Sequence, residues 1–324
     1  MTTDIQEQLT KYLTDAHSIE AQALAQLRRA PDIAGDTELA TVFEQHLTET
    51  EKHERLVRAH LDERGTSPAT LKELVMRIGG AGFLLFARLQ PDTPGKLVAH
   101  AYSYEHLELA GYELLAVVAR AAGEGAIAET AERIRGEEQA MGARLAGLFD
   151  RAVDASLREV GADDLQKRLQ KYLSDAHAIE QQAIALLERG PKIAGETALA
   201  ELLDEHLRET REHARLVEER LSAIGGSTNV LKDAALRLGA LNWGLFFQAH
   251  PDTPGKLAAF AYAFEHLEIA GYEELKRVAQ RAGDEQTVAL TDRILTEEHA
   301  AAAKLSGVFE RTAEASLEAV GAAP

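Results

Sequence analysis

The stretch HLTETEKHERLV, residues 46 to 57, has the spacing of a helix but carries ionisable residues where a core face is expected. Steps of three and four residues place on one stripe Phe43, His46, Glu49, His53, Leu56 and His60. A stripe that faces a core should be apolar, because a buried charge is costly unless a partner compensates it. The stretch therefore predicts a helix that brings a functional group into a protein core.

The pattern occurs twice in the chain. It returns as HLRETREHARLV at residues 206 to 217, with His206, Glu209 and His213 on the matching stripe. KYLTDAHSIE at residue 11 likewise returns as KYLSDAHAIE at residue 171, and PDTPGKL occurs at residues 91 and 251. Equivalent positions differ by 160 in number throughout, without a gap. We predict two copies of one domain, at residues 1–160 and 161–324.

Composition limits the class of protein. Of the 324 residues 45% are hydrophobic, and only eight are proline, which favours helices with cores of their own. A formal charge of −18 argues against nucleic acid as a partner. The absence of cysteine excludes disulfides and thiolate metal sites. The chain shows no signal peptide or membrane-spanning run, so we expect a cytoplasmic protein without a membrane partner.

Helix signals recur in the same order in each copy. In copy 1 they predict helices at about 4–29, 37–65, 94–121 and 124–157, with a shorter accessory helix at 68–90 that corresponds to 228–250 in copy 2. The predicted fold is all-α, with two tandem four-helix bundles that each have an accessory helix between helices 2 and 3. We expect the accessory helices to bury their apolar faces against the bundles, and a membrane-touching surface is the alternative.

Each long helix places a carboxylate on its core stripe. Helix 1 carries Glu20, helix 2 carries Glu49 with His53, helix 3 carries Glu105 and Glu108, and helix 4 carries Glu138. Lysine and arginine are missing from these stripes at the same level, so the carboxylates would repel one another without a cation. Carboxylate and imidazole ligands favour iron or manganese. The alternative is a relic site whose carboxylates are protonated or hydrogen-bonded.

Neighbouring residues receive other interpretations. His17 and His46 are expected to orient ligands or to be satisfied core histidines. His106 and Glu137 fall off the core stripe and are expected at a surface or interface. Tyr112 and Tyr272 are expected to pack and to hydrogen-bond a carboxylate.

The runs AxxIE, HLxETxxH, EHLEhAGY and hxxEE resemble the YciE/YciF family of ferritin-like proteins (DUF892), duplicated in tandem. The resemblance implies a ferritin-like, rubrerythrin-like bundle, a dinuclear iron or manganese centre and an association with stress. Carried over position by position, it implies as metal ligands Glu20, Glu49, His53, Glu105, Glu108, Glu138, Glu180, Glu209, His213, Glu265, Glu268 and Glu298.

Two departures from the ferritin-like pattern affect this ligand set. Glu49 and His53 are four residues apart instead of three, and Met141 and Gly142 supply no second ligand on helix 4. Ala301 and Ala302 repeat that gap in copy 2. We therefore expect one under-ligated metal position with a vacancy on the helix-4 side.

Three functions remain open at this point. The first is an oxidoreductase whose two metal ions react with oxygen or peroxide, with electrons supplied from elsewhere because cysteine is absent. The second is non-enzymatic sequestration of iron or manganese, and the third is a structural bundle with relic sites. The two halves are expected to pair as an intramolecular pseudo-dimer, and the sequence leaves a further homo-oligomer open.

Overall fold

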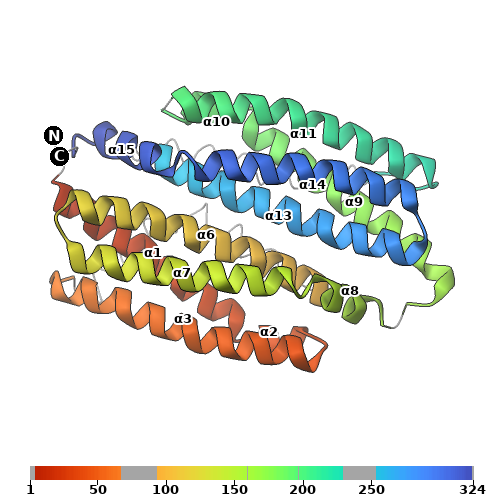
Figure 1. Cartoon of the computed structure of the whole chain (residues 1–324), viewed down its shortest axis with the longest axis horizontal. Helices are drawn as coiled ribbons and strands as arrows, with labels where there is room; N and C mark the ends of the chain where they lie inside the picture. The colour runs from red at the N-terminus through yellow and green to blue at the C-terminus, as the bar shows by residue number, and fades with distance from the viewer. Residues whose placement is uncertain (1–3, 67–92, 159, 196, 229–252, 323–324) are drawn as a thin grey trace.

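The computed structural model describes residues 4–66, 93–158, 160–195, 197–228 and 253–322. Within these ranges the regular structure is entirely helical, in two repeated halves (Figure 1). The accessory helices expected at 68–90 and 228–250 fall outside the described residues, apart from residue 228. The apolar faces that these helices were expected to bury therefore also lie outside the described residues. In the described part of the chain, no helix is long and apolar enough to cross a membrane.

The described helices of the first half are α1 (Ile5–Leu27), α2 (Ala30–Ile33), α3 (Thr37–Glu63), α6 (Pro94–Ala121), α7 (Gly125–Ala146) and α8 (Phe149–Leu157). Their starts follow the predicted signals. Asp36 Oδ1 accepts the backbone N–H groups of Glu38 and Leu39 at 3.0 and 3.2 Å. Thr93 caps α6 in the same way, with Pro94 at the first helical position.

The second half repeats this order with α9 (Ala162–Leu187), α10 (Gly190–Ile193), α11 (Thr197–Ala223), α13 (Thr253–Ala282), α14 (Glu285–Ser306) and α15 (Phe309–Ala319). In each half the four long helices surround one core. In the first half the core side chains Leu13, Phe43, Leu115 and Ile134 come from four different helices and are at most 2% exposed. The two four-helix bundles in one chain match the predicted fold class.

The fourth helix differs from the prediction. A single helix was expected over 124–157, but α7 ends at Ala146 and α8 begins at Phe149. The Leu148 N–H bonds the Leu145 carbonyl at 2.9 Å, a tighter turn that interrupts the α-helical pattern at Gly147. The break lets α8 place Phe149 edge-on to Tyr102 of α6, with ring centroids 5.4 Å apart. The free energy gained by burying Phe149 therefore outweighs the cost of interrupting the helix.

The halves pack against each other along α6 and α13, which lie side by side in the middle of the molecule (Figure 1). Equivalent residues meet across this junction. Ser103 Oγ donates to the Ala263 carbonyl at 2.6 Å, and His106 stacks on His266. Contacts between a residue and its equivalent are those of an isologous interface, with an approximate two-fold axis between α6 and α13.

Candidate metal centre

Six ionisable side chains converge in the core of the first half, from all four long helices. Glu20 comes from α1, Glu138 from α7, and two residues each come from α3 and α6. The α3 pair is His46 and His53, which share a face because seven residues are almost two helical turns. The α6 pair is Glu105 and Glu108, about one turn apart. All six are buried, with exposed fractions of 3% or less.

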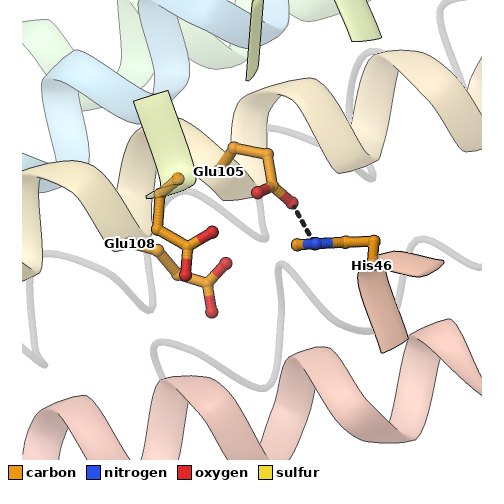
Figure 2. A group of neighbouring side chains, drawn as sticks. His46, Glu105 and Glu108 are labelled. Atoms are coloured by element: carbon orange, nitrogen blue, oxygen red, sulfur yellow. Dashed lines mark hydrogen bonds and ion pairs between the residues drawn. The ribbon is translucent and has the colours of Figure 1, made fainter. Parts of the chain in front are cut away.

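The six residues form two groups, each small enough to surround one ion. His46, Glu105, Glu108 and Glu138 offer four ligand atoms within 4.8 Å of one another, and Glu20, His53 and Glu138 offer three. Figure 2 shows the carboxylates of Glu105 and Glu108 directed toward the same space, with the His46 ring opposite Glu105. Glu138 belongs to both groups. Its carboxylate could therefore contact an ion held by either group.

His53 lies among three carboxylates. Its Nδ1 lies 2.7 Å from Glu138 Oε1 and 3.8 Å from Glu20 Oε1, and its Nε2 lies 2.7 Å from Glu137 Oε2. When Nε2 donates its proton to Glu137, the ring presents the Nδ1 lone pair to the cluster. A carboxylate behind a histidine is the usual arrangement that orients a metal ligand. Glu137, expected at a surface or interface, is half-buried and has this contact instead.

His46 is oriented in a similar way. Its Nε2 lies 2.8 Å from Glu105 Oε1, and its Nδ1 lies 3.8 Å from Glu49 Oε2. In the second half the corresponding outer contact, between His206 Nδ1 and Glu209 Oε2, closes to a hydrogen bond of 3.2 Å. The carboxylates of Glu49 and Glu209 thus lie behind a histidine, on the side away from the cluster.

The structure places His46, and not Glu49, in one of the two groups. Glu49 lies outside both groups with half of its side chain exposed, whereas His46 is 1% exposed. The reason is the rotation of α3: its buried stripe includes His46, Thr50, His53 and Val57. At about 100° per residue, Glu49 lies roughly 70° from the centre of that stripe. The spacing of His46 and His53, repeated at His206 and His213, was the available signal for a second histidine.

The second half reproduces the arrangement. One group contains His206, Glu265, Glu268 and Glu298, and the other contains Glu180, His213 and Glu298. His213 Nδ1 lies 2.9 Å from Glu298, and its Nε2 lies 2.7 Å from Glu297. Of the expected ligand positions, only Glu49 and Glu209 stay outside the groups.

A family model described as a domain of unknown function (DUF892) matches residues 4–158 and again residues 164–318. The chain belongs to the DUF892 family. The two matches, one after the other, show a tandem duplication of the domain. No solved structure matches the chain. The sites of this DUF892 protein are therefore assessed from its own residues.

Burial and mutual repulsion raise the pKa values of three acids in the cluster. Loss of water, followed by the charge of Glu138, raises the pKa of Glu20 to about 8. Burial raises the pKa of Glu105 to about 7, even though His46 opposes the shift. Burial also raises the pKa of Glu108 well above its ordinary value, and the charges of Glu138, Glu20 and Glu105 add to the shift. These shifts favour the protonated, uncharged form of the three carboxyls.

The pKa values of the two histidines are raised, although burial alone would lower them. Burial lowers the pKa of His53, but Glu138, Glu20 and Glu137 outweigh burial and raise it to about 9. Glu105 and Glu49 likewise raise the pKa of His46 well above its ordinary value against the effect of burial. Both histidines therefore favour the protonated form, whose charge offsets that of the neighbouring carboxylates.

Unsatisfied oxygens show that the residues present fit a metal. Both carboxylate oxygens of Glu108 and of Glu138 are buried without a hydrogen bond of ordinary geometry in the described part of the chain. The 2.7 Å contact of Glu138 with His53 is close but lacks that geometry. Buried acceptors left in this way are costly, and a metal ion would satisfy several at once. Four carboxylates and two neutral imidazoles carry a charge of −4, equal and opposite to two divalent cations.

Tyrosines complete the cluster as expected. The Tyr112 hydroxyl donates to Glu20, and the Tyr272 hydroxyl donates to Glu180 in the second half. The remaining buried histidine of α1, His17, lies apart, with Nε2 3.0 Å from Glu54 Oε1. Its Nδ1 is buried without a hydrogen bond in the described part of the chain, so only one ring nitrogen of His17 is satisfied, and His17 belongs to neither group.

The vacancy expected beside Gly142 is filled. A Cβ atom built on Gly142 would lie 3.0 Å from His106 Cε1, so the His106 ring occupies this space. The space next to the cluster lies elsewhere, in a cavity of about 20 Å³ that touches His46 and Glu105. In the second half, a cavity of about 10 Å³ also touches His206 and Glu265, but it is otherwise lined from α11 and α14, with Ala301 among its residues. Cavities of this size hold one molecule of about the size of water.

Proposed function

We propose that each half binds a dinuclear iron or manganese centre and that the ions react with oxygen or peroxide. The observation that carries the proposal is Glu138, one carboxylate shared by two groups of ligand atoms. Ferritin-like dinuclear sites use four carboxylates and two imidazoles, and the same total is found here. The distribution differs, because both histidines come from α3.

The donor set narrows the choice of metal. Magnesium and calcium prefer shells made only of oxygen, and soft metals prefer thiolate, which this chain lacks. Imidazole together with carboxylate suits iron and manganese. Glu20 and His53 would hold one ion, while His46, Glu105 and Glu108 would hold the other. Glu138 would contact both.

A bound iron or manganese pair supplies redox chemistry, the exchange of electrons with a small oxidant. The surrounding residues favour such an oxidant over a larger substrate. The cavity beside His46 and Glu105 admits one molecule of about the size of water, and it is otherwise lined mostly by apolar side chains such as Phe43 and Leu97. Tyr112 fixes Glu20, and Glu137 fixes His53, so the ligands stay in place when the charge of the site changes.

Metal content tests the first part of the proposal. Purified protein is stripped with a chelator, reloaded without oxygen with ferrous iron or manganese, and measured by elemental analysis. We expect about four ions per chain, two for each half. Glu138→Ala should retain about two, because the second half is intact, and Glu138→Ala/Glu298→Ala should retain almost none. Glu113→Ala, which removes a carboxylate of the same helix bundle that pairs with Arg135, should retain all four.

Addition of peroxide or oxygen to the ferrous protein tests the second part. We expect consumption of the oxidant in the parent and not in the double variant. Metal that stays bound without consumption would favour sequestration instead. A parent that takes up no metal would support the structural bundle with relic sites.

A further inference from the structure

A cavity between the two halves has a volume of about 250 Å³ and lies away from both carboxylate clusters. Side chains of α6, α8, α9 and α13 line it. The pseudo-two-fold axis relates this cavity to a second one. Its lining residues Tyr172, Ile179 and Gly271 correspond to Tyr12, Ile19 and Gly111 in the second cavity. That second cavity measures only about 40 Å³.

The tandem linkage makes the two cavities unequal. At the end of the second half, α15 runs on to Ala319, and Leu317 is 2% exposed. At the end of the first half, α8 stops at Leu157, which is only half-buried, because the chain turns there into α9. Leu157 lines the large cavity, whereas Leu317 does not line the small one. Identical folds in one chain thus leave one of the two junctions open.

The sequence of the open cavity has also diverged. Glu274 stands where the other half has Leu114, and Arg168 stands where it has Gln8. Leucine is buried at this position in the first half, so the fold does not need an acid there. Glu274 is nevertheless 3% exposed, and its Oε1 has no hydrogen-bond partner in the described part of the chain. Such a group destabilises the folded protein unless a ligand uses it.

Gly95 allows Glu274 to occupy its position. A Cβ atom at Gly95 would lie 3.0 Å from both carboxylate oxygens of Glu274. Burial raises the pKa of Glu274 to about 8, and the charges of Arg277 and Lys96 oppose that shift. A cation placed in the cavity would stabilise the ionised carboxylate.

The charges along the cavity are ordered. Glu274 is buried, whereas Arg168 and Lys171 are exposed at its outer side. The half-buried Lys96 and Asp175, which carry opposite charges, also line the cavity. Tyr172, which lies on α9 one residue beyond Lys171, and Leu157 contribute apolar surface to the lining.

We propose that this cavity binds a small zwitterion, with its ammonium group at Glu274 and its carboxylate at Arg168 and Lys171. A short apolar chain between the two charges packs against Leu157 and the ring of Tyr172. The volume suits a molecule of the size of an amino acid, and the site is independent of the metal clusters.

Calorimetric titration of the full chain with 6-aminohexanoate tests the proposal. Hexanoate and hexylamine serve as matched probes that lack one charge each. We expect 6-aminohexanoate to bind at one site per chain and at least about tenfold more tightly than either probe. Equal binding of hexanoate would refute the role of Glu274, and equal binding of hexylamine would refute the role of the exposed bases.

Variants that copy the other half separate binding from folding. Glu274→Leu installs the residue found at position 114 and should weaken binding on the order of 100-fold. Arg168→Gln installs the residue of position 8 and should weaken it about two- to fivefold, as expected for an exposed ion pair. Lys11→Ala, the counterpart of Lys171→Ala, should leave binding unchanged. If Glu274→Leu does not fold, Glu274→Gln takes its place with the same expected loss.

The same titration on chelator-treated protein should give the same affinity, because no cluster residue lines the cavity. A parent that binds none of the three probes, or a Glu274→Leu protein that binds like the parent, would overturn the proposal.

Discussion

His106 and His266 stack on each other across the junction of the halves, with ring centroids 3.5 Å apart and planes 14° apart. The two residues are equivalent in the duplicated sequence, so the approximate two-fold axis passes between their rings. The Nδ1 of each lies 2.7 Å from a backbone carbonyl of its own helix, at Tyr102 and Tyr262. Each ring is thereby oriented by its own helix, independently of the stacking contact.

The stack should couple the two halves. We expect His106→Ala to destabilise the protein by about 1–3 kcal/mol, because a buried ring is removed. The cost in the His106→Ala/His266→Ala protein should be smaller than the sum of the single costs, by about 0.5–1.5 kcal/mol. Denaturant unfolding measures all of these values. His60→Ala is the control, because His60 contacts Thr130 and not the stacked pair. The unfolding free-energy costs of His60→Ala and His106→Ala should simply add in the double variant. Strict additivity for the stacked pair would contradict the coupling.

Carboxylates behind the histidines should tune metal affinity without setting the number of ions. We expect Glu137→Gln/Glu297→Gln to weaken metal binding about 10- to 100-fold, because His53 and His213 lose the groups that orient them. At saturating metal the protein should still hold the parental number of ions. Glu49→Gln/Glu209→Gln should behave in the same way. Competition with a coloured chelator measures the affinity, and loss of half the ions in either protein would make these residues ligands instead.

Removal of metal should lower the melting temperature. Without cations the buried carboxylates must stay protonated or repel one another, whereas bound metal stabilises the folded state by about 2.7 kcal/mol when its concentration is 100 times Kd. For domains of this size that corresponds to a shift of several degrees, about 2–4 °C for each kcal/mol. Calorimetric melting with and without chelator measures the shift. Glu138→Ala/Glu298→Ala should melt at one temperature in both conditions.

Glu274 should make stability fall as pH rises. The folded protein keeps this proton up to about pH 8, whereas the unfolded chain releases it near its ordinary pKa of 4.5. Between these values the folded state binds more protons, so its contribution is fully present below pH 4.5 and is lost as pH rises through 8. The loss is about 1.4 kcal/mol per pH unit and on the order of 5 kcal/mol in total.

The comparison with Glu274→Leu isolates this effect, since the metal clusters titrate alike in both proteins. The free energy of unfolding of the variant should exceed that of the parent by an amount that grows from pH 5 to pH 8. A constant difference over this range would mean that Glu274 is already ionised in the folded protein.

Local sequence signals were enough to predict where the helices start and which residues form most of the cluster. Asp36, Thr93 and Pro94 start helices where predicted, because capping depends on neighbouring backbone groups. Glu20, Glu108 and Glu138 could be selected as buried acids because each interrupts an apolar stripe of its own helix. Because equivalent residues differ by 160 in number, each assignment in the first half also applied to the corresponding residue of the second half.

The rotation of α3 was decided only by tertiary packing. Glu49 and His46 are three residues apart, so each lies within about 60° of the other around the helix axis. Either could face the core on periodicity alone, and the neighbouring helices determine that His46 does. The break at Gly147 has the same origin, because it depends on the burial of Phe149 against Tyr102 of another helix.

The sequence by itself determined that the chain is a duplicated helical bundle with buried acids, because periodicity, caps and repeats are properties of neighbouring residues. Only the tertiary structure decided that two groups share Glu138, that His106 fills the space beside Gly142, and that one junction cavity is open while its counterpart is nearly closed. These features arise between residues on different helices. Their distances depend on how the helices pack, which no local pattern specifies.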